Sequence, residues 1–392
     1  MATVQQTPLR YAIGGMIAMA VAMGIGRFVY TPILPGMMDE LGLSASDAGL
    51  IASANYLGYL LGAFAAGGGW AAGRERPLML AALAASALLA AFMAAGEGMA
   101  LFLAVRFLAG VASAFVMVFL STIVFSHLAA AGRSDLQAVH FAGVALGISL
   151  SSLMTGALVV ADAPWFEGWI WAAVLSAAGF AVAAALVTGG PVGAGTTVRE
   201  PALPKNPALF RVIVAYGLFG LGYIVTATFL VAIVRAGNGG RLFESAVWLV
   251  TGLAGIPSIY LWNRLARRLG LTATYAIGCV VEAVGVAASV ALGDVVGPLV
   301  GGALLGGTFI ALTAIGLQLG RLLAPEAPRR ALALMTVAFG LGQIFGPVAA
   351  GFLADGTGGY LVPSLAAAAV LLASAIVALS AGEATKAGKA TK

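Results

Sequence analysis

Twelve long apolar runs dominate this chain and leave it few possible folds. Each run is long enough for an α-helix to cross the hydrocarbon core of a membrane, which takes about 20 residues. Hydrophobic residues make up 61% of the 392 residues and charged residues only 9%, against about 25% charged in soluble domains. A soluble enzyme and a disordered chain are therefore excluded. The runs are continuous and do not alternate, which also excludes a membrane β-barrel.

The sequence therefore predicts an all-α membrane protein with twelve transmembrane helices joined by short loops. Its single cysteine, Cys279, lies inside an apolar run and predicts no intrachain disulfide. The expected spans are residues 11–37, 48–71, 78–95, 99–127, 137–161, 166–188, 209–235, 244–266, 271–292, 296–323, 330–354 and 360–381.

The basic residues of the loops predict the orientation in the membrane. With a cytoplasmic N-terminus, sixteen of the 20 Lys and Arg residues fall on the cytoplasmic side, and only Arg235 and Arg241 fall outside. Cytoplasmic loops carry such an excess, so we expect a multi-pass protein of the inner (plasma) membrane with both termini cytoplasmic. The net charge of +5 then reflects orientation, and no nucleic-acid partner is expected. Trp165, Trp169 and Trp171 are expected to form an interfacial aromatic belt.

The two halves of the sequence match one another at an offset of 196 or 199 residues. The matched segments are 24–31 with 220–227, 106–110 with 302–306, and 143–147 with 342–346. This repeat predicts an N-terminal six-helix half at 1–188, a cytoplasmic linker at 189–208, a C-terminal six-helix half at 209–381 and a cytoplasmic tail at 382–392. Parallel repeats with substrate held near the midplane are a known transporter design.

Three segments resemble the major facilitator superfamily. Arg106 followed by Gly110 is similar to its span-4 motif, and residues 342–351 are similar to its glycine-proline motif. Residues 24–35, GIGRFVYTPILP, resemble the span-1 signature of the YbfB/YjiJ branch. The resemblance implies the major facilitator fold, with spans 1, 4, 7 and 10 lining a cavity. Gly73 stands where the loop 2–3 motif has an acid, and span 5 lacks a Gly-Pro dipeptide, which argues against a typical multidrug exporter.

Charged residues at membrane depth are rare here and point to function. They are Arg27, Arg106 and Glu282, and the apolar parts of spans 1–6 contain no Asp or Glu. Buried guanidiniums call for an anion, and their fork of donors matches a carboxylate or phosphate. We predict that Arg27 anchors the anionic group of a substrate, with Arg106 as the second candidate. The repeat mate of Arg27 is Tyr223, so the fold does not require this charge.

Neutral polar residues on the lining spans extend the predicted substrate site. Tyr30 follows Arg27 by three residues and is expected on nearly the same helix face. Tyr223 and Thr226 repeat that spacing on span 7. The remaining candidates are Asn55, Tyr59 and Gln343. Glu282 and His140 are titratable groups within spans and are the candidates for proton coupling, each weighed against a structural role.

The sequence thus predicts a secondary transporter that moves a small organic anion or carboxylate-bearing metabolite by alternating access. It is expected to be a monomer in the lipid bilayer, to act on a small-molecule substrate, and to use protons if Glu282 or His140 couples. No enzyme activity, cofactor or metal is expected, because no catalytic or metal-ligand set is recognisable. Two alternatives remain: an exporter of apolar or amphipathic compounds with Arg27 structural, and a non-transporting membrane sensor or assembly partner.

Overall fold

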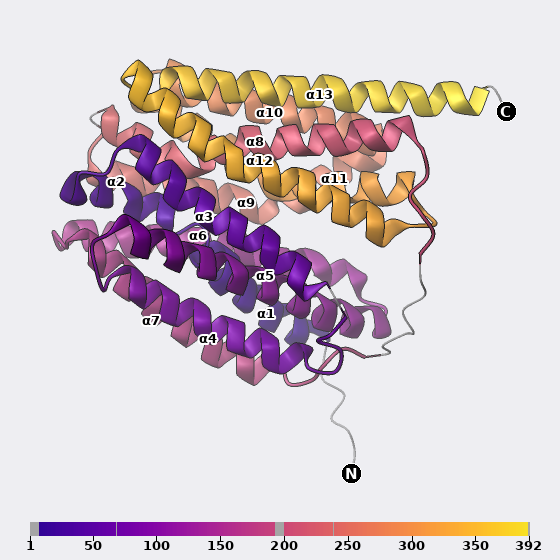
Figure 1. The fold of residues 1–392 in the computed structure, drawn as a ribbon, viewed down its shortest axis with the longest axis horizontal. Coiled ribbons are helices and arrows are strands. Elements are labelled where there is room, and N and C mark those ends of the chain that lie inside the picture. The colour runs from indigo at the N-terminus through magenta and orange to yellow at the C-terminus, as the bar shows by residue number, and fades with distance from the viewer. Residues whose placement is uncertain (1–7, 68, 193–199, 238, 391–392) are drawn as a thin grey trace, which may run out of the picture. The chain divides into compact units, whose positions relative to one another are not determined.

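The predicted fold class is confirmed. The computed structural model describes residues 8–67, 69–192, 200–237 and 239–390, and every regular element within them is a helix (Figure 1). Twelve of the helical segments are long and apolar enough to cross a membrane.

Span 1 consists of three consecutive pieces, α1 (Pro8–Met19), the π-helical segment η1 (Ala20–Ile25) and α2 (Tyr30–Leu41). The other spans of the first half are α3 (Ala45–Ala66), α4 (Glu75–Met93), α5 (Met99–Ala130), α6 (Gln137–Val160) and α7 (Trp165–Leu186), with a short 3₁₀ turn, η2 (Ser134–Leu136), before α6. The second half contains α8 (Pro207–Ala236), α9 (Arg241–Leu269), α10 (Leu271–Ala291), α11 (Val296–Leu323), α12 (Pro328–Thr357) and α13 (Leu361–Ala390).

By their internal contacts, the residues divide into two compact units. The first contains Met1–Leu41 and Ala54–Thr196, and the second contains Gly42–Ser53 and Thr197–Lys392. The predicted linker at 189–208 lies partly outside the described residues, at 193–199. The backbone of α13 is helical as far as Ala390, beyond the predicted end of the last span at residue 381.

The same glycine-mediated helix crossing occurs in both units, as a duplicated six-helix arrangement requires. In the first unit, a Cβ atom at Gly110 of α5 would overlap the carbonyl oxygen of Asn55 of α3. In the second unit, a Cβ atom at Gly306 of α11 would overlap the carbonyl oxygen of Thr251 of α9. A second equivalent pair of crossings has the same form. A Cβ atom at Gly143 would overlap the carbonyl oxygen of Met16 in the first unit, and one at Gly342 would overlap that of Gly217 in the second. Glycine permits these approaches because it lets two helix backbones meet.

Span 1 is interrupted, whereas its repeat mate is continuous. The regular α-helical hydrogen bonding ends at η1 and is mixed at residues 26–29, where Gly26 nevertheless keeps α-helical dihedral angles. The regular pattern resumes in α2 at Tyr30. Pro32 accounts for the position of the break, since proline has no N–H to donate and its ring clashes with the carbonyl four residues earlier. Span 7, in contrast, is one unbroken α-helix, Pro207–Ala236. The interruption is therefore not a requirement of the repeat.

Candidate functional site

Arg27 lies in the turn that interrupts span 1 and is only 4% exposed. Its guanidinium carbon lies over three aromatic rings, 4.3 Å from the centroid of Tyr59, 5.0 Å from that of Tyr56 and 5.6 Å from that of Phe28. Aromatic faces attract a guanidinium electrostatically. The rings contact the group through its carbon-bearing centre, whereas the N–H donors of a guanidinium lie in its plane and point outward. The arrangement is therefore compatible with bidentate binding of a carboxylate.

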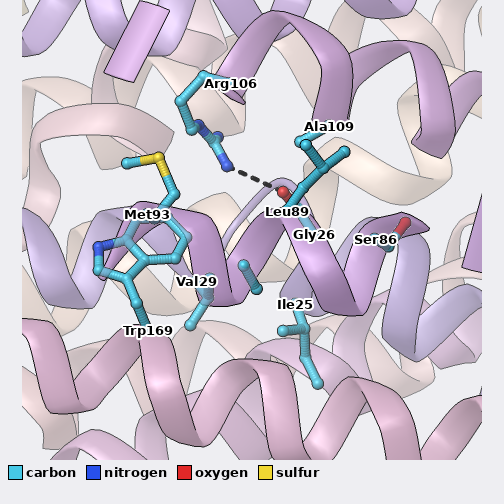
Figure 2. Close-up of a pocket in the computed structure, with 10 residues that line it drawn as sticks. Ile25, Gly26, Val29, Ser86, Leu89, Met93, Arg106, Ala109 and Trp169 are labelled. Atoms are coloured by element: carbon cyan, nitrogen blue, oxygen red, sulfur yellow. Dashed lines mark hydrogen bonds between the residues drawn. The ribbon is translucent and has the colours of Figure 1, made fainter. Parts of the chain in front are cut away.

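Arg106 binds the backbone of the same turn. Its Nη1 donates to the carbonyl of Gly26 at 2.9 Å, as Figure 2 shows, and its Nη2 donates to the carbonyl of Arg27 at 3.0 Å. The guanidinium carbon lies 5.1 Å from the ring centroid of Tyr30 and 5.7 Å from that of Trp169. The side chain is 1% exposed. These contacts give Arg106 the geometry of a residue that supports the turn.

The first unit thus brings together five of the predicted site residues: Arg27, Tyr30, Asn55, Tyr59 and Arg106. Asn55 is fully buried, and its Nδ2 donates to the carbonyl of Arg106 at 3.0 Å. Tyr30 was expected on nearly the same helix face as Arg27, and that expectation stays a prediction. The ring of Tyr30 faces the guanidinium of Arg106.

Several residues that contact Arg27 or Arg106 were not predicted from the sequence. Phe28 and Tyr56 were not among the predicted site residues. Phe28 follows Arg27 directly in the sequence, whereas Tyr56 lies on another helix, α3, and a contact between helices leaves no spacing pattern. Trp169 was expected in an interfacial belt, but its side chain is 2% exposed. Its Nε1 donates to the sulfur of Met37 at 3.5 Å. Trp171, at 48% exposed, remains compatible with a belt position.

In the second unit, a hydrogen bond joins two of the predicted substrate-site residues. The side-chain amide of Gln343 donates to the hydroxyl of Tyr223. The Tyr223 ring is nearly parallel to Phe309, at 5.9 Å between centroids and 11° between planes, and to Phe339, at 5.7 Å and 15°. Thr226, one turn further along α8, is fully buried. This unit therefore presents an aromatic wall with one polar pair.

The two candidates for proton coupling are both fully buried. Glu282 lies on α10, and the hydroxyl of Thr308 on α11 is its polar neighbour. The Nε2 of His140 on α6 lies 3.3 Å from the hydroxyl of Ser121. Its ring packs edge-on against Phe125, 5.2 Å away, and Phe141, 5.0 Å away. His140 thus occupies a largely apolar position between helices.

A small cavity adjoins Arg106 in the first unit (Figure 2). Its wall is mainly apolar and includes Ile25, Val29, Met93 and Trp169. The volume is about 10 Å³, which is room for about one water molecule. This cavity is therefore too small to hold an organic substrate. No group of three or more His, Cys, Asp or Glu side chains among the described residues could hold a metal ion.

Known proteins share this architecture. The family model described as "Uncharacterised MFS-type transporter YbfB" matches residues 19–379. A mutant of the nucleoside transporter NupG superposes with a TM-score of 0.76 at 15% identity, over 95% of this chain and 99% of that one. A bacterial homologue of the human lysosomal transporter Spinster, inward-facing and occupied, superposes with a TM-score of 0.71 at 13% identity, over 98% of each chain. No curated protein matches the sequence.

Proposed function

We propose that this chain, which belongs to the family of the MFS-type transporter YbfB, is a secondary transporter of a small organic anion or carboxylate-bearing metabolite. Membership of the family makes it a multi-pass membrane transporter. The proposal adds the substrate class, the alternating-access mechanism, and an inner-membrane location with both termini in the cytoplasm.

The observation that supports the substrate class is the setting of Arg27. A guanidinium at 4% exposure in the middle of a membrane span is costly, and the same position in the second half holds a neutral tyrosine, Tyr223. Its guanidinium carbon lies over Tyr59, 4.3 Å from the ring centroid. This contact restricts the plane in which the donors lie, which favours planar, bidentate partners such as carboxylates.

The other residues of the candidate site are proposed to orient Arg27, to contact the substrate or to couple protons. Tyr59 and Tyr56 orient the Arg27 guanidinium, and Arg106 supports the turn that carries it. In the second unit, Tyr223 and Gln343 are proposed to offer polar contacts to the substrate, with Thr226 on the same helix. Glu282 and His140 stay candidates for proton coupling, and anion exchange or uniport is the simpler mechanism if neither couples.

A thermal-shift screen of the purified, full-length protein tests the proposal. Carboxylates, phosphonates, sulfonates and lipophilic cations are compared on wild type, Arg27→Ala and Arg27→Lys. A ligand at 100 times its Kd stabilises the folded state by about 2.7 kcal/mol. We expect one anion class to stabilise the wild type, Arg27→Ala to lose the shift, and Arg27→Lys to keep a reduced one because a single ammonium cannot bind bidentately.

Arg133→Ala is the matched control. That arginine is exposed in a loop and pairs with Asp135 at 2.8 Å, so its loss should leave the anion response unchanged. Stabilisation by cations or neutral amphiphiles that persists in Arg27→Ala would contradict the proposal and favour an exporter of apolar or amphipathic compounds with Arg27 structural.

A further inference from the structure

In span 1, the backbone hydrogen bonds just before the turn leave one carbonyl without its usual α-helical donor. The N–H of Gly26 donates to Val21, five residues back, at 2.8 Å. The N–H of Arg27 donates to Met23, four residues back, at 3.3 Å. These two bonds pass over the carbonyl of Ala22, which lies between the two acceptors. A π-helical turn of this kind often marks a functional position in a helix.

The ladder is disturbed again after the turn. The N–H of Thr31 donates to Phe28, three residues back, at 3.2 Å. Pro32 follows and has no N–H to donate. The carbonyl of Arg27, which Thr31 would bind in a regular α-helix, therefore lies where the pattern of span 1 is disturbed, and that of Gly26 precedes it directly.

Two side chains of α5 donate to the three carbonyls at these irregularities. The hydroxyl of Ser113 donates to Ala22 at 2.8 Å, and the guanidinium of Arg106 donates to Gly26 at 2.9 Å and to Arg27 at 3.0 Å. Ser113 follows Arg106 by seven residues, so the two lie on one face of α5, about two turns apart. Buried carbonyls need such partners, because an unmet buried acceptor is costly.

The repeat provides an internal comparison. At an offset of 196 residues, Arg106 corresponds to Gly302 and Ser113 to Phe309, and neither replacement has a polar side chain. Gly302 approaches Val247 and Thr251 of α9, whereas Phe309 stacks on Tyr223 of α8, which is an uninterrupted helix. The donors are thus present in the half whose span is interrupted and absent from the half whose span is continuous.

We propose that Ser113 and Arg106 are positioning residues that hold span 1 in its interrupted form and thereby place Arg27 against Tyr59. Closing the π turn into α-helix would shift the register by one residue and rotate the following segment by about 100°. That rotation would move Arg27 off the Tyr59 ring. The effect on transport rests on the proposed function, whereas the placement of Arg27 does not.

Hydrogen exchange of the ligand-free, full-length protein, followed by mass spectrometry, tests the placement. Ser113→Ala should speed exchange of the amides at residues 24–29 by about tenfold, because the turn loses one of its donors. Arg106→Lys, which cannot reach both carbonyls at once, should have a larger effect. Exchange at residues 220–227 of the unbroken mate should not change in either variant.

Ser149→Ala is the matched control, since that buried hydroxyl donates to Ala145 of its own helix at 3.0 Å. Unchanged exchange at residues 24–29 in Ser113→Ala, or an equal increase in Ser149→Ala, would overturn the proposal.

A binding measurement separates this proposal from that of the anion site. Benzoate and phenylphosphonate serve as carboxylate and phosphonate probes in thermal-shift titrations of wild type and Ser113→Ala. With Arg27 misplaced, the midpoint concentration of an effective probe should rise about tenfold in Ser113→Ala and stay unchanged in Ser149→Ala. An unchanged midpoint would contradict a link between Ser113 and Arg27. If neither probe stabilises the wild type, the anion proposal loses support, and the exchange result alone decides the role of Ser113.

Discussion

Gly306 and Gly307 are adjacent in α11, yet alanine is expected to have opposite effects at the two positions. A Cβ at Gly306 would overlap the carbonyl oxygen of Thr251 on α9 and lie 2.8 Å from its carbonyl carbon. Apart from its own stretch of α11, no heavy atom lies within 4 Å of a Cβ at Gly307. The pair therefore separates the close approach of two helices from the general flexibility of glycine.

The expected magnitudes follow from these contacts. Alanine is about 1 kcal/mol more favourable than glycine in a helix interior, so Gly307→Ala should raise stability by up to about that amount. At Gly306 the same gain is opposed by overpacking, which costs about 1–3 kcal/mol. The clash is with backbone, which no change of rotamer can relieve, so the cost should lie at the upper end. We expect Gly306→Ala to lower stability by about 1–2 kcal/mol net.

Thermal unfolding in a single detergent, at one scan rate, measures the difference, since membrane proteins commonly unfold irreversibly. The expected order of melting temperatures is Gly307→Ala at or above wild type, and Gly306→Ala clearly below it. Gly110→Ala, whose Cβ would overlap Asn55 in the first unit, should behave like Gly306→Ala. Equal effects at Gly306 and Gly307 would refute the reasoning, because loss of glycine and not helix contact would then determine stability.

Three further substitutions test individual interactions. Tyr223→Phe removes the acceptor of the buried Gln343 amide and should lower the free energy of unfolding by about 1–3 kcal/mol; an unchanged melting temperature would contradict this. Glu244→Gln weakens the largely buried pair with Arg235 and should cost about 1–3 kcal/mol, which added salt should not reproduce in the wild type. Glu282→Gln preserves the size of the side chain, so the stability should not change. Transport into liposomes driven by a pH gradient should disappear if this residue couples protons. Transport that persists in this variant would remove Glu282 as a candidate.

The twelve spans were predictable because a membrane helix is a local feature of the sequence. An apolar run signals it without any knowledge of its neighbours. The tenth span was expected at 296–323 and is observed at Val296–Leu323. Errors concentrate at helix ends, where polar residues extend helices beyond the apolar run. The third span, for example, was expected at 78–95 and is observed at Glu75–Met93.

The candidate site was only partly predictable. Its charged residues can be recognised from the sequence around each of them, but their contacts depend on how the helices pack. Arg27 and Arg106 are conspicuous as charges within apolar runs. Their different contacts, aromatic rings around Arg27 and backbone carbonyls at Arg106, depend on how helices pack. The face shared by Arg27 and Tyr30 was inferred for a regular helix, whereas the hydrogen bonding around these residues is irregular. A spacing argument holds only as far as the helix is continuous.

Ser113 shows why such a residue leaves no signal in the sequence. A serine within a helix usually bonds back to the carbonyl four residues earlier, and Ser113 does so with Ala109 at 2.9 Å. Its second acceptor, Ala22, exists only because the ladder of a neighbouring helix is disturbed. The repeat makes the exception visible once the structure is known. The second half replaces Arg27, Arg106 and Ser113 with Tyr223, Gly302 and Phe309. All three departures converge on one turn. The helix crossings are kept in both units, so packing alone does not call for these three side chains.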